Sequence, residues 1–442
     1  MSALLEYAVQ AVELENFSKD IPDLVPRSNT LYAKFKKNAN VVPISNETAA
    51  GGVQRPPLRA PMRIQGGAAM AQGTGNADSL YRGSGSQWAS FAVAPVFIYN
   101  PCEISYLSRR ATQGSKRGLI NVSAEEMNNT LEAAMQGLEA LCQGDGSGTL
   151  DTIPSTATVN NGTGSGQSLS SIVGLNNAFQ FTDQQTVQVF ASVGGLNRGS
   201  FTISYVDPVT QTIYSAQALP VGTATGDLLV VQGAPGTAGG SILGLHAWQV
   251  NSNTGTIGGL ARANYPSRLS TPIINLNNAP ISTSLPWRAQ ILLGRALGPD
   301  NKAFKSITWY TGPDQGYQIG NFYLNVLSSR IDSQGKSAEK APDMTPRGMP
   351  PSYGGIDLTV GYNAQPGRLD LFTFDTWTMG EMIPLELYDF GNGMTMAPVP
   401  DIGTAGGTYL TSTMFVYHSC WNLLNSNVRA GVIVSNAAQP SL

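Results

Sequence analysis

The sequence predicts an α+β protein, and three of its segments indicate this class. Residues 123–141 carry apolar side chains at steps of three and four, which is typical of an amphipathic helix. Residues 149–260 contain short stretches of alternating apolar and polar side chains, which indicate strands. A helix, a strand and a second helix are predicted over 286–330, and further strands follow. Helices and strands thus occur in separate blocks, as they do in α+β proteins.

The composition indicates that partners cover much of the surface. The chain has 442 residues and a mass of 46.6 kDa, enough for about two or three domains. Only 12% of the residues are charged, about half of the ~25% usual in soluble domains. Because few charges are available for an exposed monomer surface, we expect contacts with other subunits.

The N-terminal residues 1–62 are predicted to form an extended arm, because they lack sustained periodicity and are interrupted by six prolines. Residues 63–90 consist mostly of small and polar residues, with too few large apolar side chains for a core. We therefore predict that about the first hundred residues cannot fold alone. Neighbouring copies would supply the missing contacts.

Charge is distributed unevenly along the chain. Residues 24–117 contain twelve basic residues and three acids, a net charge of +9, so the rest of the chain carries −12. A basic arm and an acidic body favour attraction between neighbouring copies. A solvated charged tail is the alternative interpretation.

The helix over 123–141 is predicted to begin at a capping box, with Ser123 as the N-cap and Glu126 three residues later. Gly144 is the expected stop. The apolar stripe consists of Met127, Leu131, Ala134, Leu138 and Leu141. The predicted polar side carries Glu125, Glu126, Glu132 and Glu139. No basic residue lies between Ser123 and Asp145, so this helix suits a basic partner.

The predicted strands include TVQVFASV, FTISYVD and TIYSAQAL, and they make residues 149–260 an all-β module. Helices are expected over 286–298 and 318–330, with the strand SITWYTG between them. After a Pro-rich loop at 342–351, two strands over 414–436 are predicted to pair as a hairpin through an Asn-Ser-Asn turn.

The GDGSG loop at 144–148 does not match a nucleotide or calcium loop. It follows a helix, whereas a dinucleotide loop follows a strand, and a calcium loop needs oxygens where this one has Gly146 and Gly148. We predict a helix stop and a tight turn that uses positive φ at glycine. The Gly335–Ser337 stretch, GKS, lacks the earlier glycine of a phosphate loop, because Arg330 stands there, and is predicted to be a surface loop.

The sequence offers few catalytic side chains. His246 and His418 are the only histidines, each predicted to lie within an apolar strand. His418 and Cys420 share a strand face, but no Asn or Asp is identified to orient such a pair. The other cysteines, Cys102 and Cys142, are far apart in sequence, which suggests neither disulfides nor a zinc site.

No serine hydrolase elbow occurs, and a spatial pair of carboxylates for glycan cleavage stays open. The N-terminus lacks the basic region of a signal peptide, and the longest apolar run, 91–99, is too short to span a membrane. We therefore predict a protein that is not an enzyme, with no catalytic, cofactor-binding or metal-binding residues, no cofactor and no membrane partner.

Taken in order, these segments resemble the major capsid protein of tailed bacteriophages, a family with the Johnson fold. The helix followed by GDGSG (123–148) resembles the spine helix and the glycine-rich stretch after it. GLARANYP (259–266) and the helix, strand and helix over 286–330 resemble the axial domain.

The resemblance implies five segments. These are an N-terminal arm (1–62), a β extension loop (63–110), a peripheral domain with the spine helix (111–150), a mixed axial domain (151–400) and C-terminal strands that return to the peripheral domain (401–442). The β-rich stretch 175–250 is either an added lobe or an enlargement of the axial domain. No lysine lies between Lys37 and Lys116, so we expect no isopeptide cross-link from the extension loop.

The resemblance also implies function. We expect a structural subunit that assembles in the bacterial cytoplasm, as pentamers and hexamers, into an icosahedral head. Its expected partners are further copies of itself, separate scaffolding, portal and decoration proteins, and packaged double-stranded DNA, bound without sequence specificity. Two alternatives stay open: a phage tail or baseplate β protein, and a glycan-binding or glycan-hydrolysing β protein.

Overall fold

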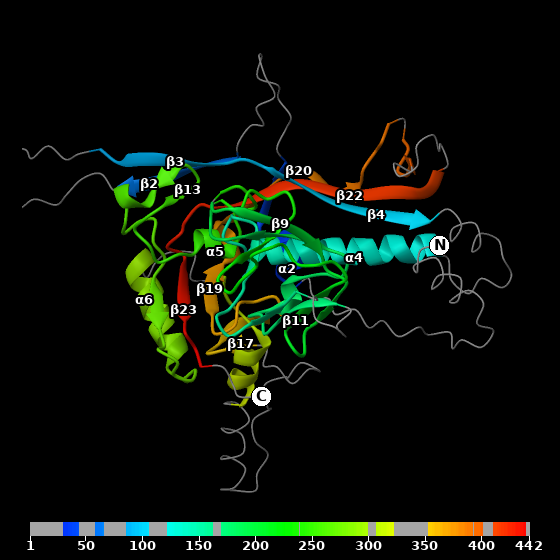
Figure 1. The fold of residues 1–442 in the computed structure, drawn as a ribbon. Helices are drawn as coiled ribbons and strands as arrows, with labels where there is room; N and C mark the ends of the chain where they lie inside the picture. Colours follow the sequence, from blue (N-terminus) through cyan, green and yellow to red (C-terminus); the bar gives the residue numbers. More distant parts are fainter. Residues whose placement is uncertain are drawn as a thin grey trace, which may run out of the picture.

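A computed structural model describes ten stretches of the chain: residues 30–43, 58–65, 85–105, 122–161, 169–237, 239–298, 306–321, 352–391, 393–400 and 410–438. Figure 1 shows their arrangement: a long upper sheet with helix α4 beneath it, a β lobe in front, and a lower sheet flanked by helix α6. The mixture of helices and sheets confirms the predicted α+β class.

The upper sheet is built around β22 (Leu410–Asn425). On one edge, β22 pairs with β4 (Val96–Ser105) in antiparallel register. On the other edge, it pairs with β21 (Ala397–Pro400) and then with β20 (Trp377–Leu387). The short strand β1 (Asn40–Pro43) runs parallel to β20 on its outer side. Segments from both ends of the chain thus share one sheet.

Helix α4 (Val122–Gln143) lies beneath β4 and β22, as Figure 1 shows. It begins one residue before the predicted N-cap Ser123, which places Ser123 inside the first turn instead of at the cap. The side chains at this end lie outside the described residues. The helix ends immediately before Gly144, so the predicted stop is confirmed.

Helix α2 (Thr30–Asn38) lies within the predicted extended arm and packs on α4. Its Leu31, Tyr32 and Phe35 are buried in the same core as α4 and the upper sheet, and Phe35 is fully buried. The prediction that this part of the arm lacks material for a core is therefore wrong. Phe35 is buried by aromatic side chains from distant parts of the chain, and such contacts cannot be predicted from local periodicity.

The strands β2 (Leu58–Gln65) and β3 (Gln87–Val93) form an antiparallel hairpin. Its inner side chains Leu58, Phe91 and Val93 are buried in the main core. The prediction that residues 63–90 have too few large apolar side chains to join a core is therefore wrong for β3, whose core contacts come from the same chain. The remaining parts of the first hundred residues, at 1–29, 44–57 and 66–84, lie outside the described residues.

The β lobe consists of two four-stranded sheets that enclose a separate core. The first sheet has the order β5 (Thr149–Thr152), β12 (Leu228–Val231), β8 (Thr186–Phe190) and β9 (Asn197–Thr202). The second has the order β10 (Tyr205–Asp207), β11 (Thr212–Ser215), β7 (Ser170–Val173) and β6 (Thr158–Asn160). The predicted strands TVQVFASV and TIYSAQAL are confirmed in their first parts, as β8 and β11. The prediction of FTISYVD as one strand is wrong, because its residues are divided between β9 and β10, which belong to different sheets.

The lower sheet is mixed and has six strands. Their order is β15 (Ile273–Asn275), β23 (Gly431–Ser435), β19 (Leu369–Thr373), β16 (Ile307–Thr311), β18 (Ile356–Val360) and β17 (Ser352–Tyr353). Helix α6 (Leu285–Leu297) packs against β23, which confirms the helix predicted at 286–298. The helix predicted at 318–330 already begins at 313, and its part beyond 321 lies outside the described residues.

Short elements connect the sheets. They are α5 (Leu245–Trp248), β13 (Thr256–Ile257), β14 (Leu260–Ala261), and the 3₁₀ turns η1 (Ala178–Gln180), η2 (Arg262–Asn264) and η4 (Phe374–Thr376). The β13–β14 turn supports the hairpin, because the Ala92 amide donates to the Gly258 carbonyl at 2.9 Å. Among the described helices, none is both long and apolar enough to cross a membrane.

Two local predictions are wrong. The strands within 414–436 do not pair as a hairpin, because β22 belongs to the upper sheet and β23 to the lower one. The turn between them passes the chain from one sheet to the other, and the Ala430 amide donates to the Asn427 carbonyl there. His246 lies in the short helix α5 instead of a strand.

Candidate functional site

The GDGSG loop closes on the chain itself. Its glycines Gly146 and Gly148 have φ angles of 88° and 81°, as predicted for the turn. Asp145 Oδ1 accepts a hydrogen bond from the Ser147 amide at 2.9 Å, and the Gly146 carbonyl accepts one from Ser241 at 2.9 Å. A Cβ at Gly146 would lie 2.6 Å from Leu243 Cδ2, so the loop is tightly packed. The predicted turn is confirmed; the absence of a ligand stays a prediction.

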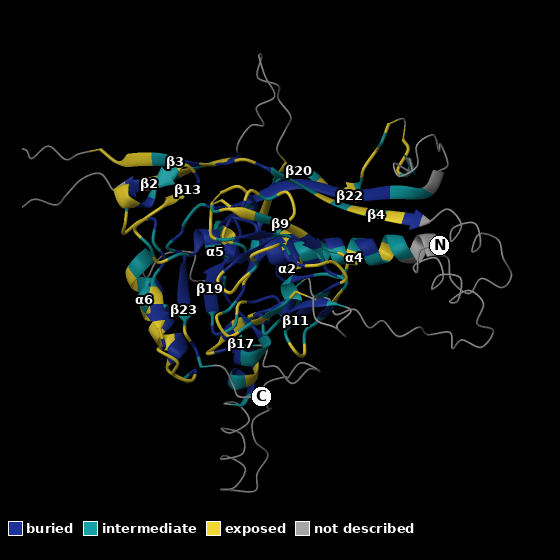
Figure 2. Cartoon of the chain, in the orientation of Figure 1, coloured by how far each residue is buried: buried dark blue, intermediate teal, exposed yellow. Residues whose placement is uncertain are grey.

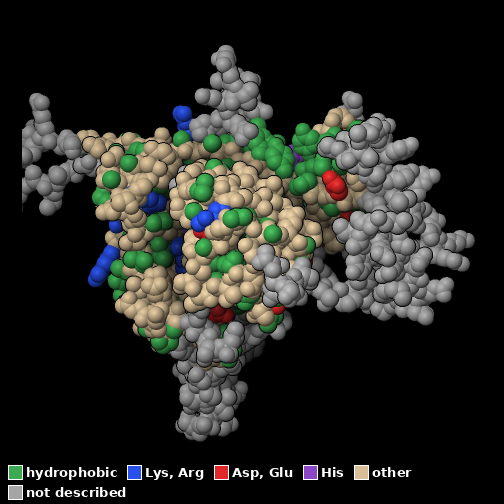
Figure 3. Space-filling model, in the orientation of Figure 1, with side chains coloured by type: hydrophobic (Ala, Val, Ile, Leu, Met, Phe, Trp, Pro, Cys, Tyr) green, Lys and Arg blue, Asp and Glu red, His purple; other side chains and the backbone are tan. Residues whose placement is uncertain are grey.

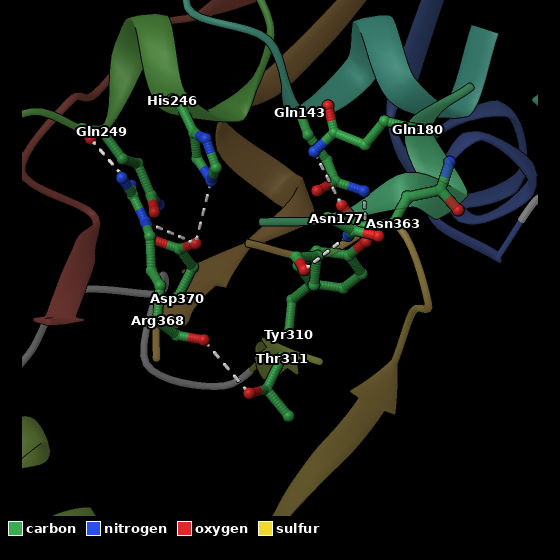
Figure 4. Close-up of polar contacts among 11 residues, drawn as sticks. Gln143, Asn177, Gln180, His246, Gln249, Tyr310, Thr311, Asn363, Arg368 and Asp370 are labelled. Atoms are coloured by element: carbon green, nitrogen blue, oxygen red, sulfur yellow. Dashed lines mark hydrogen bonds and ion pairs between the residues drawn. The ribbon is translucent and has the colours of Figure 1, made fainter. Parts of the chain in front are cut away.

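A buried polar network connects α5 with the lower sheet (Figure 4). The Arg368 side chain donates from Nε to both carboxylate oxygens of Asp370 at 3.0 Å and from Nη2 to the Gln249 carbonyl at 3.1 Å. His246 Nε2 lies 3.6 Å from Asp370 Oδ2. Burial alone would raise the pKa of Asp370, but Arg368 and His246 hold it below its usual value.

The His246 and Asp370 side chains of this network are the types found in a catalytic dyad, and here both are in contact with a buried charge pair. Burial, followed by the charge of Arg368, lowers the pKa of His246, which favours the neutral imidazole. In the described part of the chain, no serine, threonine or cysteine side chain hydrogen-bonds to His246. Asp370 is 2% exposed and its charge is balanced by Arg368. The group therefore serves as a polar connection between elements.

A second buried polar group attaches α2 to α4. Glu139 is fully buried, and its two carboxylate oxygens accept hydrogen bonds from the Leu31 and Tyr32 amides at 2.8 and 2.5 Å. These amides belong to the first turn of α2, whose donors have no partner within the helix. The prediction that Glu139 lies on a solvent-facing acidic side of α4 is therefore wrong. Its carboxylate caps another helix.

The surroundings of Glu139 affect its protonation. Burial raises its pKa to about 7, although the hydrogen bonds from Tyr32, Leu31 and Tyr310 oppose this shift. Tyr310 itself accepts a hydrogen bond from Gln143 Nε2 at 2.7 Å, as Figure 4 shows. Amide side chains continue the connection to the β lobe: Asn177 Nδ2 donates to the Tyr362 and Ala364 carbonyls at 3.0 Å.

His418 and Cys420 contact different side chains. His418 Nε2 lies 3.9 Å from Glu386 Oε1, and the Tyr388 ring meets the imidazole edge-on at 5.2 Å. The Cys420 thiol lies 3.9 Å from the Met382 sulfur. No group of three metal-binding side chains occurs within the described stretches, and none of the three cysteines forms a disulfide there. The GKS stretch, 335–337, lies outside the described residues.

The outer face of the upper sheet, opposite α4, combines aromatic and acidic side chains. Cross-strand register places Tyr99 opposite His418, and His418 opposite Glu386. Glu103 lies two pleats further along β4, on the same face as Tyr99. We call Tyr99, Glu103, Glu386 and Tyr388 the acidic–aromatic face. Tyr99 and Tyr388 are 55% and 39% exposed, and both acids are exposed.

Charge is segregated between elements. The strands β4, β20, β21 and β22 and helix α4 contain no lysine or arginine. By contrast, the hairpin β2–β3 exposes Arg59, Arg63 and Trp88 on its outer side, where Arg63 is paired with Trp88 across the strands. No acid occurs in these two strands. The fold therefore presents chemically distinct surfaces.

Helix α6 has a basic outer face. Trp287 is 71% exposed and Ile291, one turn later, is 47% exposed. Arg288 and Arg295 are exposed beside them, and no acid occurs in the helix. We call the hairpin residues Arg59, Arg63 and Trp88, together with Trp287, Arg288 and Arg295, the basic flank. Figure 3 shows Lys and Arg along this edge and Asp and Glu near the far end of β20 and β22.

Comparison with solved structures identifies the fold. A chain from a structure described as a cyanophage A-1(L) capsid asymmetric unit aligns over 96% of this chain and 98% of its own length, with a TM-score of 0.53 and 12% identity. This chain has the fold of a phage capsid protein. A chain from the capsid of a native GTA particle and a chain from a structure described as Gordonia phage Cozz each align over 99% of it, at TM-scores of 0.45 and 0.46 and identities of 8% and 10%. The alignments include 100% and 96% of the lengths of these two chains.

No protein-family model and no curated protein matches the sequence. The resemblance drawn from the helix and the GDGSG loop is nevertheless confirmed at the level of the fold. The surface residues of α6 and of the upper sheet were not predicted from sequence. The sequence signal for the α6 surface was the presence of Trp287 and two arginines in a helix that contains no acid.

Proposed function

We propose that this protein is the major structural subunit of an icosahedral phage head. One observation carries the proposal: the capsid chain fold extends over 96% of this chain and 98% of the aligned one. Because both chains are covered almost completely, the similarity is one of whole architecture instead of a shared module. The buried polar groups support a structural role, since they connect elements of the fold.

The elements fit the roles of the Johnson fold. Helix α4 takes the place of the spine, and the hairpin β2–β3 takes the place of the extension loop within 63–110, beginning earlier at Leu58. The six-stranded sheet with α6 suits the axial domain. The β lobe, with its separate core over Ala140–Leu229, suits an added lobe that begins before the predicted 175–250 region and overlaps it. The upper sheet completes the peripheral domain.

The assembled state follows from this assignment. Copies of the chain would form pentamers and hexamers in the bacterial cytoplasm and enclose double-stranded DNA, with scaffolding, portal and decoration proteins as further partners. Exposed aromatic side chains such as Trp88 and Trp287, at 65% and 71%, support extensive contacts between copies.

Electron microscopy of the purified chain, expressed with and without a scaffolding protein from the same phage genome, tests the proposal. We expect closed shells or five- and six-membered rings. Tubes or threefold rings would instead indicate a tail or baseplate protein. A monomer that turns over glycans would indicate the enzyme alternative, and either result would overturn the proposal.

A further inference from the structure

The outer face of the second sheet of the β lobe carries a row of aromatic and polar side chains. Cross-strand register places one residue from each of its four strands in this row: Tyr205, Tyr214, Ser171 and Asn160. Residues that lie opposite one another project from the same face of a sheet. We call these four residues the tyrosine row. Because neighbouring strands lie ~4.8 Å apart, the row is about 14 Å long.

The inner face of the same sheet already completes the lobe core. The corresponding inner row consists of Val206, Ile213, Ile172 and Val159, which belong to this core or pack against it. The lobe therefore needs no cover on its outer face to bury these side chains. By contrast, Tyr205 is 43% exposed, and exposed residues lie in the turns before and after β11, as Figure 2 shows.

The two tyrosines form an aromatic platform at one end of the row. Their rings are stacked, with centroids 4.3 Å apart and an angle of 20° between the ring planes. β10 is an edge strand of this sheet, so Tyr205 stands at the border of the platform. A cross-strand pair of rings stabilises a sheet by itself, so the pair indicates a ligand only together with its polar neighbours.

Hydroxyl and amide groups continue the row beyond the rings. Asn160 Nδ2 donates a hydrogen bond to Ser171 Oγ at 3.3 Å. An amide side chain has two N–H donors and one oxygen acceptor, so Asn160 can bond to further groups. The adjacent row on the same face consists of Asp207, Thr212, Val173 and Thr158. The outer face therefore combines one apolar platform with several uncharged polar groups.

The charged side chains of the lobe have partners within the lobe. Residues 149–237 contain five of them. Arg198 and Asp227 form an ion pair, with 2.8 Å between Nε and Oδ2. The three other acids accept hydrogen bonds from backbone amides, Asp151 from Asn176, Asp183 from Val206 and Asp207 from Val209. Figure 3 shows the front of the lobe as mostly uncharged. Such a surface does not attract phosphates, which bind to lysine and arginine.

We infer that the tyrosine row binds a neutral glycan chain. A sugar ring has C–H groups on its faces and hydroxyls around its edge. Its faces can stack on the rings of Tyr205 and Tyr214, while its hydroxyls exchange hydrogen bonds with Ser171 and Asn160. The length of the row suits a chain of more than one sugar. This binding activity adds to the proposed shell function and does not depend on it.

A protein partner, such as a second copy of the chain, is the competing occupant of the tyrosine row. Protein interfaces usually have an apolar centre that is surrounded by polar residues. Here the rings of Tyr205 and Tyr214 lie at one end of the row, and the polar side chains extend from them in one direction across the sheet. This arrangement favours an elongated ligand that has both apolar faces and hydroxyls.

Isothermal titration calorimetry of the full chain with maltohexaose, cellohexaose and chitohexaose tests the inference. We expect at least one of these neutral oligosaccharides to bind. Tyr205→Ala should weaken this binding at least about tenfold, because it removes half of the platform. Tyr205→Phe keeps the ring and should keep most of the affinity. Tyr317→Ala is the matched control, since Tyr317 is 61% exposed outside the lobe, and its affinity should equal that of the natural chain.

Asn160→Ala tests the polar end of the row separately. It leaves both rings in place, and we expect affinity to fall about three- to tenfold because one hydrogen-bonding partner of the glycan is lost. Circular dichroism melting of each variant checks that it is folded.

Two results would overturn the inference: no binding of any of the three oligosaccharides to the natural chain, or equal affinities of the natural chain and Tyr205→Ala. If the natural chain binds no oligosaccharide and Tyr205→Ala no longer assembles, the row is a contact between copies. Failure of the natural chain to assemble would instead reject the shell function, and glycan binding by the unassembled chain would still support the inference.

Discussion

The main core and the lobe core differ in how far apart their members lie in the sequence. Buried residues of the main core extend from Leu31 to Val428, whereas those of the lobe core lie between Ala140 and Leu229. The lobe can therefore form from local contacts, which cost less chain entropy than contacts across the whole sequence. The main core requires both ends of the chain before it is complete. We expect the lobe to behave as a separate cooperative unit.

Removing Phe35 should break the main core most severely. Its ring lies 5.2 to 6.1 Å from those of Phe372, Phe374 and Trp377, so Phe35→Ala leaves a cavity in an aromatic cluster. We expect a loss of ~4 kcal/mol in the free energy of unfolding, measured by denaturant titration of the unassembled chain. Lys37→Ala, at an exposed position of the same helix, is the control. Equal stabilities would show that α2 is not part of this core.

Removing Phe201 should disturb the lobe alone. Phe201 is 1% exposed on β9, an edge strand whose surroundings can relax, so we expect a smaller loss of ~3 kcal/mol for Phe201→Ala. Hydrogen exchange should accelerate within 150–229 while the amides of β20 and β22 keep their protection. Faster exchange in both regions would show that the two cores unfold as one.

Adding a methyl group at the α4 junction should have an intermediate effect. Gly146→Ala imposes a left-handed conformation that costs a non-glycine residue ~1 to 2 kcal/mol, and its Cβ approaches Leu243. Gly137→Ala is the control within α4, because a Cβ there meets nothing within 4 Å. It should stabilise the helix by ~0.5 to 1 kcal/mol. In thermal melts, we expect Gly146→Ala to lower the melting temperature and Gly137→Ala to raise it. Shifts of the two melting temperatures in the same direction would contradict the packing described for the loop.

Protonation of Glu139 should make the stability of the main core depend on pH. Its pKa of about 7 lies above the ordinary 4.5, so the native state binds more protons than the unfolded state between these values. Stability should therefore fall as pH rises from 4.5 to 7, by at most ~1.4 kcal/mol per pH unit. Glu139→Gln should flatten this dependence, as denaturant titrations at several pH values would measure. An unchanged slope in the variant would assign the dependence to another group.

Periodicity predicted the elements that carry their own signal. Helix α4 was predicted from its apolar steps, α6 from the helical pattern over 286–298, and β16 as the strand SITWYTG. Pairing was not predictable in the same way, since β22 joins β4 from the first quarter of the chain and β20 from the last. Proximity in sequence favoured a β22–β23 hairpin that the fold does not form.

The surroundings of two side chains, Glu139 and Phe35, were predicted wrongly for a related reason. Glu139 lies among other acids of α4, so its sequence neighbours indicated a solvent face, but the amides of Leu31 and Tyr32 reach it from α2. Phe35 stands in a segment without sustained periodicity and is buried by rings from η4 and β20. Sequence patterns describe the local surroundings of a residue, whereas the burial of Glu139 and Phe35 results from residues that are distant in the sequence.

The entry and exit strands of the β lobe have a practical consequence. β5 and β12 are hydrogen-bonded neighbours. The chain therefore enters the lobe through β5 and leaves it through β12 at adjacent positions. A foreign module with closely spaced termini could be spliced between them without stretching the scaffold. The position between β5 and β12 therefore suits the insertion of another folded module.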